Sequence, residues 1–333
     1  MSPGVSGGVP RCVPAASPKL WLPTARSTHY RQRRPPRWIH LPRCSGADEG
    51  GDEQPSSSPA SQLTATLRRK QGQIKALLDD MGMEALEERL QGAGETPAHP
   101  PYRLSTLIQD SLLRPAGRPV LLLEVSRAAA PESAEAVGKL AAQYVTWGAD
   151  AIVVRTDLED TPGGMADLFA VIRAVKGRPV LIRDWMLHPI QVVEAKEAGA
   201  AGVLGTIASV LGNGTAIMSS YAASLGLDAP VEVVNRTEIK AMEQAGVPFF
   251  GINLAVKLSL ALPNFSTDMA KGLLGDLPFG ASSLVGARNK DEAVKARLAG
   301  ADAILIKQEM LAEAPNGVKA LMQDLMYALS GDD

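Results

Sequence analysis

Eight short apolar runs, regularly spaced along the last two thirds of the chain, constrain the fold more than any other feature. They fall at Val120–Val125, Ala151–Arg155, Pro179–Arg183, Gly202–Thr206, Pro230–Val234, Phe249–Ile252, Ala281–Val285 and Ala303–Lys307. Most of the intervals contain a helical pattern, which is how the strands of a parallel sheet alternate with the helices that cover it. Residues 115–333 therefore predict an α/β fold, a closed (β/α)8 TIM barrel, in preference to an open doubly wound sheet.

A weak internal repeat supports the barrel. Gly148-Ala149-Asp150-Ala151 is echoed by Gly300-Ala301-Asp302-Ala303 and, more loosely, by Gly199-Ala200-Ala201-Gly202. In each copy the first glycine stands where a helix must end in a left-handed turn before the next strand begins. No Gly-x-Gly-x-x-Gly loop follows the first run, so the dinucleotide-binding loop of a Rossmann domain is not predicted.

Residues 62–114 are predicted to form an N-terminal helical arm in front of the barrel. Its apolar positions share one helical face: Leu67, Ile74, Leu77, Leu78 and Met81. Gly82 interrupts this pattern, so we expect two shorter helices and not one long one. A proline-rich stretch around Pro100 then ends the helical segment.

Residues 1–47 contain no Asp or Glu and are rich in Ser, Pro and Ala. Their cations are Arg11, Lys19, Arg26, Arg31, Arg33, Arg34, Arg37 and Arg43. An arginine-rich, acid-free leader without an apolar core is typical of an organelle transit peptide and not of a secretory signal. We expect the chloroplast stroma as its destination, with the mitochondrion as the alternative, and a basic tail that stays attached as the other interpretation. Residues 48–61 are then the linker and cleavage zone.

The scarcity of cysteine and histidine excludes several kinds of chemistry. Both cysteines, Cys12 and Cys44, lie in the leader, which leaves the barrel without a disulfide, a thiolate nucleophile or a zinc–sulfur site. Only His99 and His188 follow, too few for a histidine-held metal or a Ser/His/Asp triad, so we expect no cofactor. A formal net charge of −2 does not favour the binding of nucleic acid, whose phosphates attract basic proteins. No run of about 18 apolar residues predicts a membrane span.

Active sites of TIM barrels lie at the carboxyl ends of the strands, so the residues there are the site candidates. They are Glu124 and Ser126, Arg183 and Trp185, Glu232, Asn253, Gly286 and Lys307, after the first, third, fifth, sixth, seventh and eighth runs. The motifs around them include Glu124-Val125-Ser126, Ile182-Arg183-Asp184-Trp185 and Gly251-Ile252-Asn253. In this order they resemble the indole-3-glycerol-phosphate synthase family, and so does the arm with its Leu86-Glu87-Glu88-Arg89. The resemblance covers nearly everything after the linker.

The resemblance implies a reaction, the closure of the indole ring of an anthranilate-derived ribulose phosphate with loss of carbon dioxide and water. It implies catalytic roles for Glu124, Glu232 and Arg183. It implies substrate-binding roles for Ser126, Trp185, Asn253, Gly286 and Lys307. Each residue also has a structural interpretation. The two glutamates would pair with Arg183, Asn253 would tie strand ends together, Trp185 would belong to the core, Gly286 would form a turn, and His188 would begin a helix.

The sequence departs from the family where the family places lysines, because Ser126 follows the first strand and Arg183 ends the third. An arginine stays protonated, with a pKa above roughly 12, so it holds an anion but donates a proton poorly near neutral pH. The family's Glu-Ser pair on the seventh strand is replaced by Leu284-Val285, and its Gly-Glu-Ser after the eighth by Lys307-Gln308-Glu309. Ring-closing activity is therefore doubtful.

Two hypotheses about function remain. The first is a synthase of tryptophan biosynthesis, a carbon–carbon lyase. The second is a non-catalytic pseudoenzyme barrel with a binding, regulatory or assembly role in the plastid. A third, phosphoribosylanthranilate isomerase, fits poorly because the arm and the Arg-Asp-Trp stretch have no place in it. An anionic small molecule is the expected ligand, and the sequence identifies no protein partner.

Overall fold

The computed structural model describes residues 59–330 except 96, 99, 114–116, 128–131, 158–162 and 255–266, so the predicted leader lies outside the described residues. Its strands form one parallel sheet in the order β4-β3-β2-β1-β9-β8-β7-β6-β5. They are β1 (Val120–Val125), β2 (Ala151–Arg155), β3 (Val180–Arg183), β4 (Gly202–Leu204), β5 (Thr206–Ile207), β6 (Val231–Glu232), β7 (Phe249–Ile252), β8 (Ser282–Ala287) and β9 (Ala303–Ile306).

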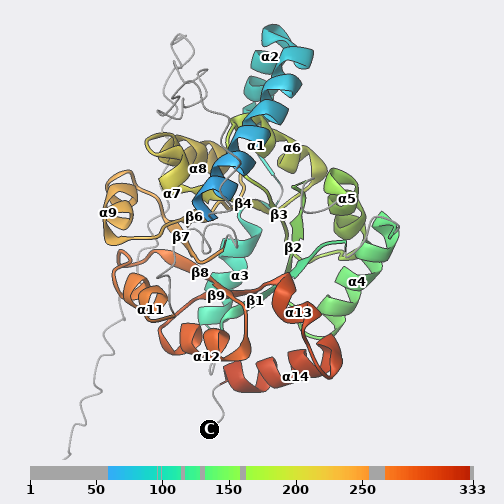
Figure 1. Ribbon diagram of the computed structural model, residues 1–333, viewed down its shortest axis with the longest axis vertical. Coiled ribbons are helices and arrows are strands. Elements are labelled where there is room, and N and C mark those ends of the chain that lie inside the picture. Colours follow the sequence, from blue (N-terminus) through green and yellow to red (C-terminus); the bar gives the residue numbers. More distant parts are fainter. Residues whose placement is uncertain are drawn as a thin grey trace, which may run out of the picture. The chain divides into compact units, whose positions relative to one another are not determined.

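The sheet closes on itself because β4 and β5 are two halves of one strand. β4 pairs with β3 and β5 pairs with β6, and Gly205 separates the halves with a φ of 108°. A Cβ at this position would lie 1.7 Å from the carbonyl oxygen of Asp184, so only glycine fits. Counted as one strand, the two halves complete a barrel of eight, and the predicted (β/α)8 fold is confirmed (Figure 1).

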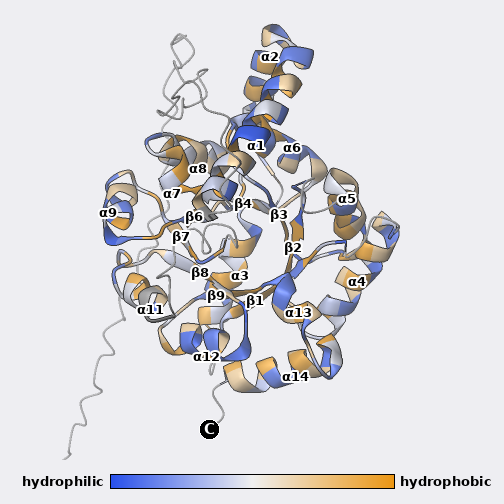
Figure 2. Ribbon diagram, viewed as in Figure 1, coloured by the Kyte–Doolittle hydropathy of each residue, from blue (hydrophilic) through white to orange (hydrophobic). Residues whose placement is uncertain are grey.

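Helices surround the barrel between the strands. They are α4 (Ala134–Thr146), α5 (Gly164–Ala174), α6 (Pro189–Ala198), α7 (Ala208–Leu211), α8 (Gly214–Ser224), α9 (Arg236–Gln244), α11 (Thr267–Gly275), α12 (Lys290–Leu298), α13 (Gln308–Ala312) and α14 (Gly317–Ser330). Ser133, Asn235 and Asn289 begin three of them by accepting a hydrogen bond from the backbone N–H three residues on. Apolar residues mark the strands and both kinds of residue mark these helices, as their half-buried position requires (Figure 2).

Alternate residues of a strand face opposite sides of the sheet, and this alternation carries charge to one end of the barrel. Leu122 of β1 and Leu305 of β9 belong to the apolar cluster inside the barrel, whereas Leu121 packs against the helices. Two residues beyond the interior leucines stand Glu124 and Lys307. The interior is therefore apolar along most of each strand and charged at its carboxyl end, which we call the barrel mouth.

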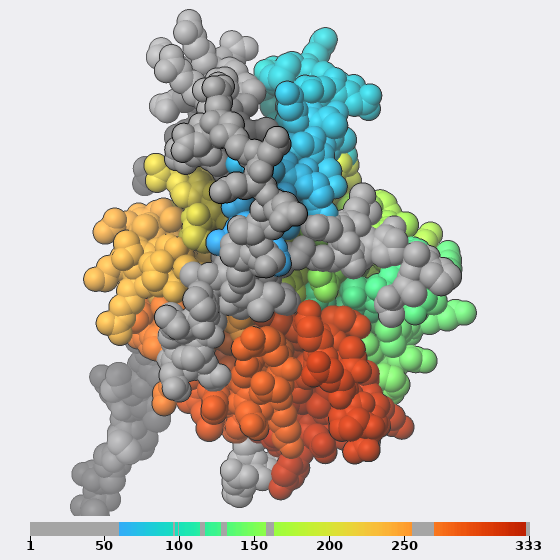
Figure 3. All heavy atoms as spheres, in the orientation of Figure 1, coloured from blue at the N-terminus to red at the C-terminus, as the bar shows by residue number. Residues whose placement is uncertain are grey.

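The helical arm crosses the mouth. α1 (Pro59–Met81) and α2 (Met83–Glu95) meet at Gly82, whose φ is 76°, so the predicted break is confirmed. Two α1 side chains reach residues just beyond strands: Arg69 Nη2 lies 3.1 Å from an Asp157 carboxylate oxygen, and Lys70 Nζ lies 2.6 Å from one of Asp184. Figure 1 shows α1 across the front of the barrel, and Figure 3 shows α2 standing beyond the surrounding helices.

A third helix of the arm, α3 (Arg103–Leu112), closes the opposite end. Leu104 and Ile108 are almost fully buried in the apolar cluster inside the barrel. The Asp228 carboxylate, ahead of β6, accepts a hydrogen bond from the Leu104 backbone N–H at 2.8 Å. Because α1 and α3 lie at opposite ends, a ligand would approach the interior from the α1 end. Within the part of the chain that the structure describes, no helix is long and apolar enough to cross a bilayer.

Candidate active site at the barrel mouth

Glu124 contacts groups from several neighbouring elements at the mouth. Its side chain is fully buried, and Oε1 accepts a hydrogen bond from Arg183 Nη1 at 2.6 Å. Oε2 accepts one from the backbone N–H of Gln308 at 3.0 Å, at the start of α13. Arg155 Nε of β2 lies 3.5 Å from Oε1. The structural interpretation of Glu124 as an ion-pair partner of Arg183 is confirmed, and Arg155 is a further member that the sequence did not single out.

Glu232 holds the second buried carboxylate of the mouth, on the two-residue strand β6. It is 1% exposed, and its Oε1 accepts a hydrogen bond from the Leu254 backbone N–H at 2.9 Å. The expected partner was Arg183, but the contact found here ties β6 to the turn after β7. A carboxylate held by a backbone donor is fixed in orientation, which suits either a structural tie or a positioned base.

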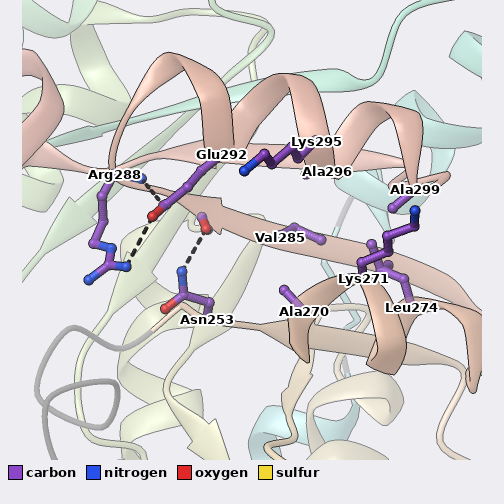
Figure 4. Close-up of a pocket in the computed structure, with 11 residues that line it drawn as sticks. Asn253, Ala270, Lys271, Leu274, Val285, Arg288, Glu292, Lys295, Ala296 and Ala299 are labelled. Carbon is purple, nitrogen blue, oxygen red and sulfur yellow. Dashed lines mark hydrogen bonds and ion pairs between the residues drawn. The ribbon is translucent and has the colours of Figure 1, made fainter. Parts of the chain in front are cut away.

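Asn253, Gly286 and Lys307 form one packed group at the ends of β7, β8 and β9. Asn253 has a φ of 56° and donates from Nδ2 to the Gly286 carbonyl oxygen at 2.9 Å, so its expected role as a tie between strand ends is confirmed (Figure 4). Gly286 lies inside β8, which corrects the expectation of a turn. A Cβ there would come within 2.1 Å of the Asn253 carbonyl oxygen and 2.7 Å of Lys307 Cε, so this glycine makes room for the lysine.

Lys307 points into the mouth and is fully buried. Its Nζ donates to Asn253 Oδ1 at 3.4 Å, a long hydrogen bond to a neutral group. Burial, reinforced by the nearby positive charge of Arg183, lowers the pKa of Lys307 to about 8, although Glu232 and Glu124 oppose the shift. The resemblance implies a substrate-binding role for Lys307, which stays a prediction, and the structure places its amine in the mouth beside Asn253.

Three further sequence candidates have plainer surroundings. Ser126 is buried just beyond β1. Trp185 is 7% exposed and belongs to the apolar cluster between sheet and helices, so its core role is favoured and a stacking role for its ring stays a prediction. His188 begins α6, where its Nδ1 accepts from the Ile190 backbone N–H, as expected of a helix-start residue. Burial lowers the pKa of His188 to about 4, which keeps the ring neutral near neutral pH.

Sequence reasoning missed the contribution of the arm. The Lys70–Asp184 pair is about nine-tenths buried on both sides, and burial raises the pKa of Asp184 while Lys70 lowers it. A pocket opens beside this pair, lined by apolar residues of α1 and by Ile182 and Met186. Lys70 lies 114 residues before Asp184, so no local pattern joins them. The signal available was the placement of Lys70 on the helix that carries the apolar stripe.

A second pocket lies on the outer side of β7 and β8 and is lined by residues of α11 and α12 (Figure 4). Lys271, Arg288 and Lys295 contribute to its wall, and Glu292 binds Arg288 at 3.0 Å. It touches the mouth through Asn253 and Gly286. The described residues bring together no group of three or more side chains suited to hold a metal ion.

These features define a class of protein, a TIM barrel whose candidate site is a charged mouth crossed by an N-terminal helical arm. The model of the indole-3-glycerol phosphate synthase family matches residues 64–321. The chain belongs to the indole-3-glycerol phosphate synthase family. The match includes most of the arm and most of the barrel.

Curated relatives agree with this assignment. An indole-3-glycerol phosphate synthase from Opitutus terrae is 31% identical over 220 residues, which cover 62% of this chain and 80% of that protein. The protein of the same name from Rhodococcus opacus is 33% identical over 196 residues, covering 57% of this chain and 72% of the relative. Among solved structures, "Native KDPGal structure" matches with a TM-score of 0.47 and 17% identity over 62% of this chain and 93% of that one, too weak a similarity to add to the assignment.

Proposed function

We propose that this chain keeps the architecture of its family without the ring-closing activity, and acts as a binding, regulatory or assembly protein in the plastid. The observation that carries the proposal is the buried ion pair between Glu124 and Arg183. Ring closure needs a general acid and a carboxylate that can handle the other proton. Arg183 donates a proton poorly because its guanidinium stays protonated. It also holds the Glu124 carboxylate in an ion pair, so this carboxylate is already engaged.

The other replacements work in the same direction. Leu284 stands where the family carries a glutamate, and it is fully buried among the apolar residues inside the barrel. A carboxylate there would be desolvated. The position therefore contributes to the packing of the barrel interior and offers no group for acid–base catalysis. Ser126 offers a hydroxyl where the family has a lysine. Loss of one general acid costs about 10²–10⁴ in rate, and this site lacks a carboxylate as well.

Positive and negative side chains lie close together at the strand ends of the mouth. Among the described residues at the strand ends, the cations Arg155, Arg183 and Lys307 lie near the carboxylates of Glu124, Glu232 and Glu309. An anionic ligand must therefore compete with carboxylates already inside the protein. We propose that such a ligand, if it is the family's sugar-phosphate adduct, binds here without being converted.

The deciding experiment uses the purified full chain and carboxyphenylamino-deoxyribulose phosphate. Indole fluorescence follows turnover, and calorimetry follows binding of the same compound. We expect no turnover from the wild type and a measurable rate once both lysines are restored in Ser126→Lys/Arg183→Lys. Arg288→Lys, outside the mouth, is the matched control and should stay inactive. Wild-type turnover that disappears in Glu232→Gln but persists in Glu243→Gln, on the exposed side of α9, would contradict the proposal.

One observation favours ring closure as the second candidate function. Lys307 brings an amine with a pKa of about 8 into the mouth, where the family's Gly-Glu-Ser element is replaced by Lys307-Gln308-Glu309. An acid of that pKa can donate near neutral pH, which Arg183 cannot do. Under this alternative the rate of ring closure would fall as the pH rises through about 8. Lys307→Met would lose turnover, whereas Lys319→Met, at an exposed residue of α14, would keep it.

A further inference from the structure

Lys307 is a buried amine whose surroundings do not match its charge. The side chain has no exposed surface, and the hydrogen bond that it makes among the described residues is the 3.4 Å contact to the neutral Asn253 carboxamide. The ion pairs found among the described residues do not include Lys307. An ammonium group has three donors and needs an anion when it leaves water. The geometry therefore favours the neutral amine, which has a free electron pair.

The charged neighbours of Lys307 act in opposite senses, Arg183 against the ammonium form and Glu232, Glu124 and Glu309 in favour of it. Arg183 places a second positive charge near the amine, and this repulsion adds to the effect of burial. The carboxylates of Glu232 and Glu124 attract the ammonium form, but both are engaged, with the Leu254 backbone N–H and with Arg183. With a pKa of about 8, about half of the Lys307 amines are unprotonated at pH 8, against well under 1% for a lysine at its usual value.

A desolvated lysine beside another cation is a known route to an amine nucleophile that attacks carbonyl carbon. Lys307 has that environment at the carboxyl end of a barrel strand, where barrels conduct their chemistry. Gly286 packs directly against Cε of this lysine, since a Cβ there would lie 2.7 Å away, and only glycine leaves room for the side chain. The buried carboxylate of Glu232 stands close enough for its charge to act on the amine, so a group able to accept and return a proton is present.

We propose that the Lys307 amine forms an imine with the carbonyl carbon of a small aldose or ketose, phosphorylated or not, in the barrel mouth. The nitrogen–carbon bond forms first and gives a carbinolamine. The carbon–oxygen bond then breaks, and the oxygen leaves as water. One proton of this water comes from the amine nitrogen, and the other is the proton that left the ammonium group, held meanwhile by a nearby carboxylate. The product is a protonated imine. The proposal does not depend on whether the chain closes indole rings.

The test traps the imine by reduction. The full chain is incubated with glycolaldehyde, glyceraldehyde 3-phosphate or dihydroxyacetone phosphate in the presence of cyanoborohydride, which converts an imine to a stable secondary amine. Intact mass and a peptide map then locate the adduct. We expect one adduct per chain on the peptide that contains Lys307, with a rate that rises with pH and has a midpoint near 8.

Lys319, exposed on α14, is the internal reference, and it should react more slowly than Lys307 at pH 7.5. Lys307→Arg keeps the charge and should lose the adduct. The peptide map of the wild-type chain reports on Lys307 directly, so the outcome does not require the variant to fold. Labelling spread over exposed lysines with no preference for Lys307 would overturn the proposal, whatever the turnover measured with the family's substrate.

Discussion

At the scale of single residues, the two central cations of the mouth are compensated in different ways. Arg183 shares a 2.6 Å ion pair with the buried Glu124 carboxylate. Lys307 has only the long contact to Asn253. Removing one partner of the first pair leaves a buried charge behind, whereas removing Lys307 takes away a charge that the structure compensates poorly. Loss of one partner of the Arg183–Glu124 pair should therefore destabilise the fold, whereas loss of Lys307 should stabilise it. The effect of losing Lys307 should depend on pH.

We expect Lys307→Met to be more stable than the wild type at pH 7. The folded pKa of Lys307, about 8, lies below the unfolded value of 10.5. The unfolded chain therefore binds more protons between these values, and wild-type stability rises with pH through that window. The shift corresponds to on the order of 3 kcal/mol, fully present as a penalty below pH 8 and gone above 10.5. Urea unfolding of both chains at pH 7, 8.5 and 9.5 measures the difference.

The free-energy advantage of Lys307→Met should shrink as the pH rises. Lys319→Met, at an exposed lysine, should show no such trend. An advantage that stays constant over this range would mean that the lysine titrates alike in the folded and unfolded chains, and the prediction would fail.

At the scale of elements, the closure of the barrel depends on the break between β4 and β5. We expect Gly205→Ala to destabilise the fold by more than about 4 kcal/mol, because the new Cβ would meet backbone 1.7 Å away and the φ of 108° is strained as well. Gly177→Ala is the matched control, since its φ is 81° but no atom lies within 4 Å of the new Cβ. It should cost only about 1–2 kcal/mol. Equal losses in thermal unfolding would show that the strand break is not needed for closure.

The attachment of α1 to the barrel is a second feature at the scale of elements. Lys70→Met would leave the buried Asp184 carboxylate without its lysine. Because breaking a buried pair costs about 3–5 kcal/mol, we expect α1 to open more often while the barrel strands stay closed. Amide hydrogen exchange should be faster in α1 and unchanged in β1 and β9. Lys75→Met, exposed on the same helix, is the control, and equal exchange in both variants would refute the role of the pair.

At the scale of the whole molecule, the barrel could be predicted because its signal is local and repeated. Each strand is a short apolar run, and alternation alone places Lys307 on the interior face with Leu305. The group that Lys307 joins could not be predicted in the same way. Asn253, Gly286 and Lys307 come from three strands, and their contact depends on the register of the closed sheet. The Lys70–Asp184 pair depends on how the arm lies, which no repeat in the sequence encodes.

The leader is a property of the whole chain that the described residues do not reach, and it stays a proposal. Residues 1–47 combine arginines with a complete absence of carboxylates, a composition that import into an organelle uses and that a folded barrel does not require. We expect a fluorescent protein fused behind residues 1–61 to enter plastids and to lose the leader, with the new N-terminus between residues 48 and 61. Arg33→Glu/Arg34→Glu/Arg37→Glu should abolish import, because it introduces the acids that the leader lacks, whereas lysines at the same positions should preserve it. Accumulation in mitochondria would select the alternative destination, and a chain that keeps residues 1–47 in the cytosol would refute targeting altogether.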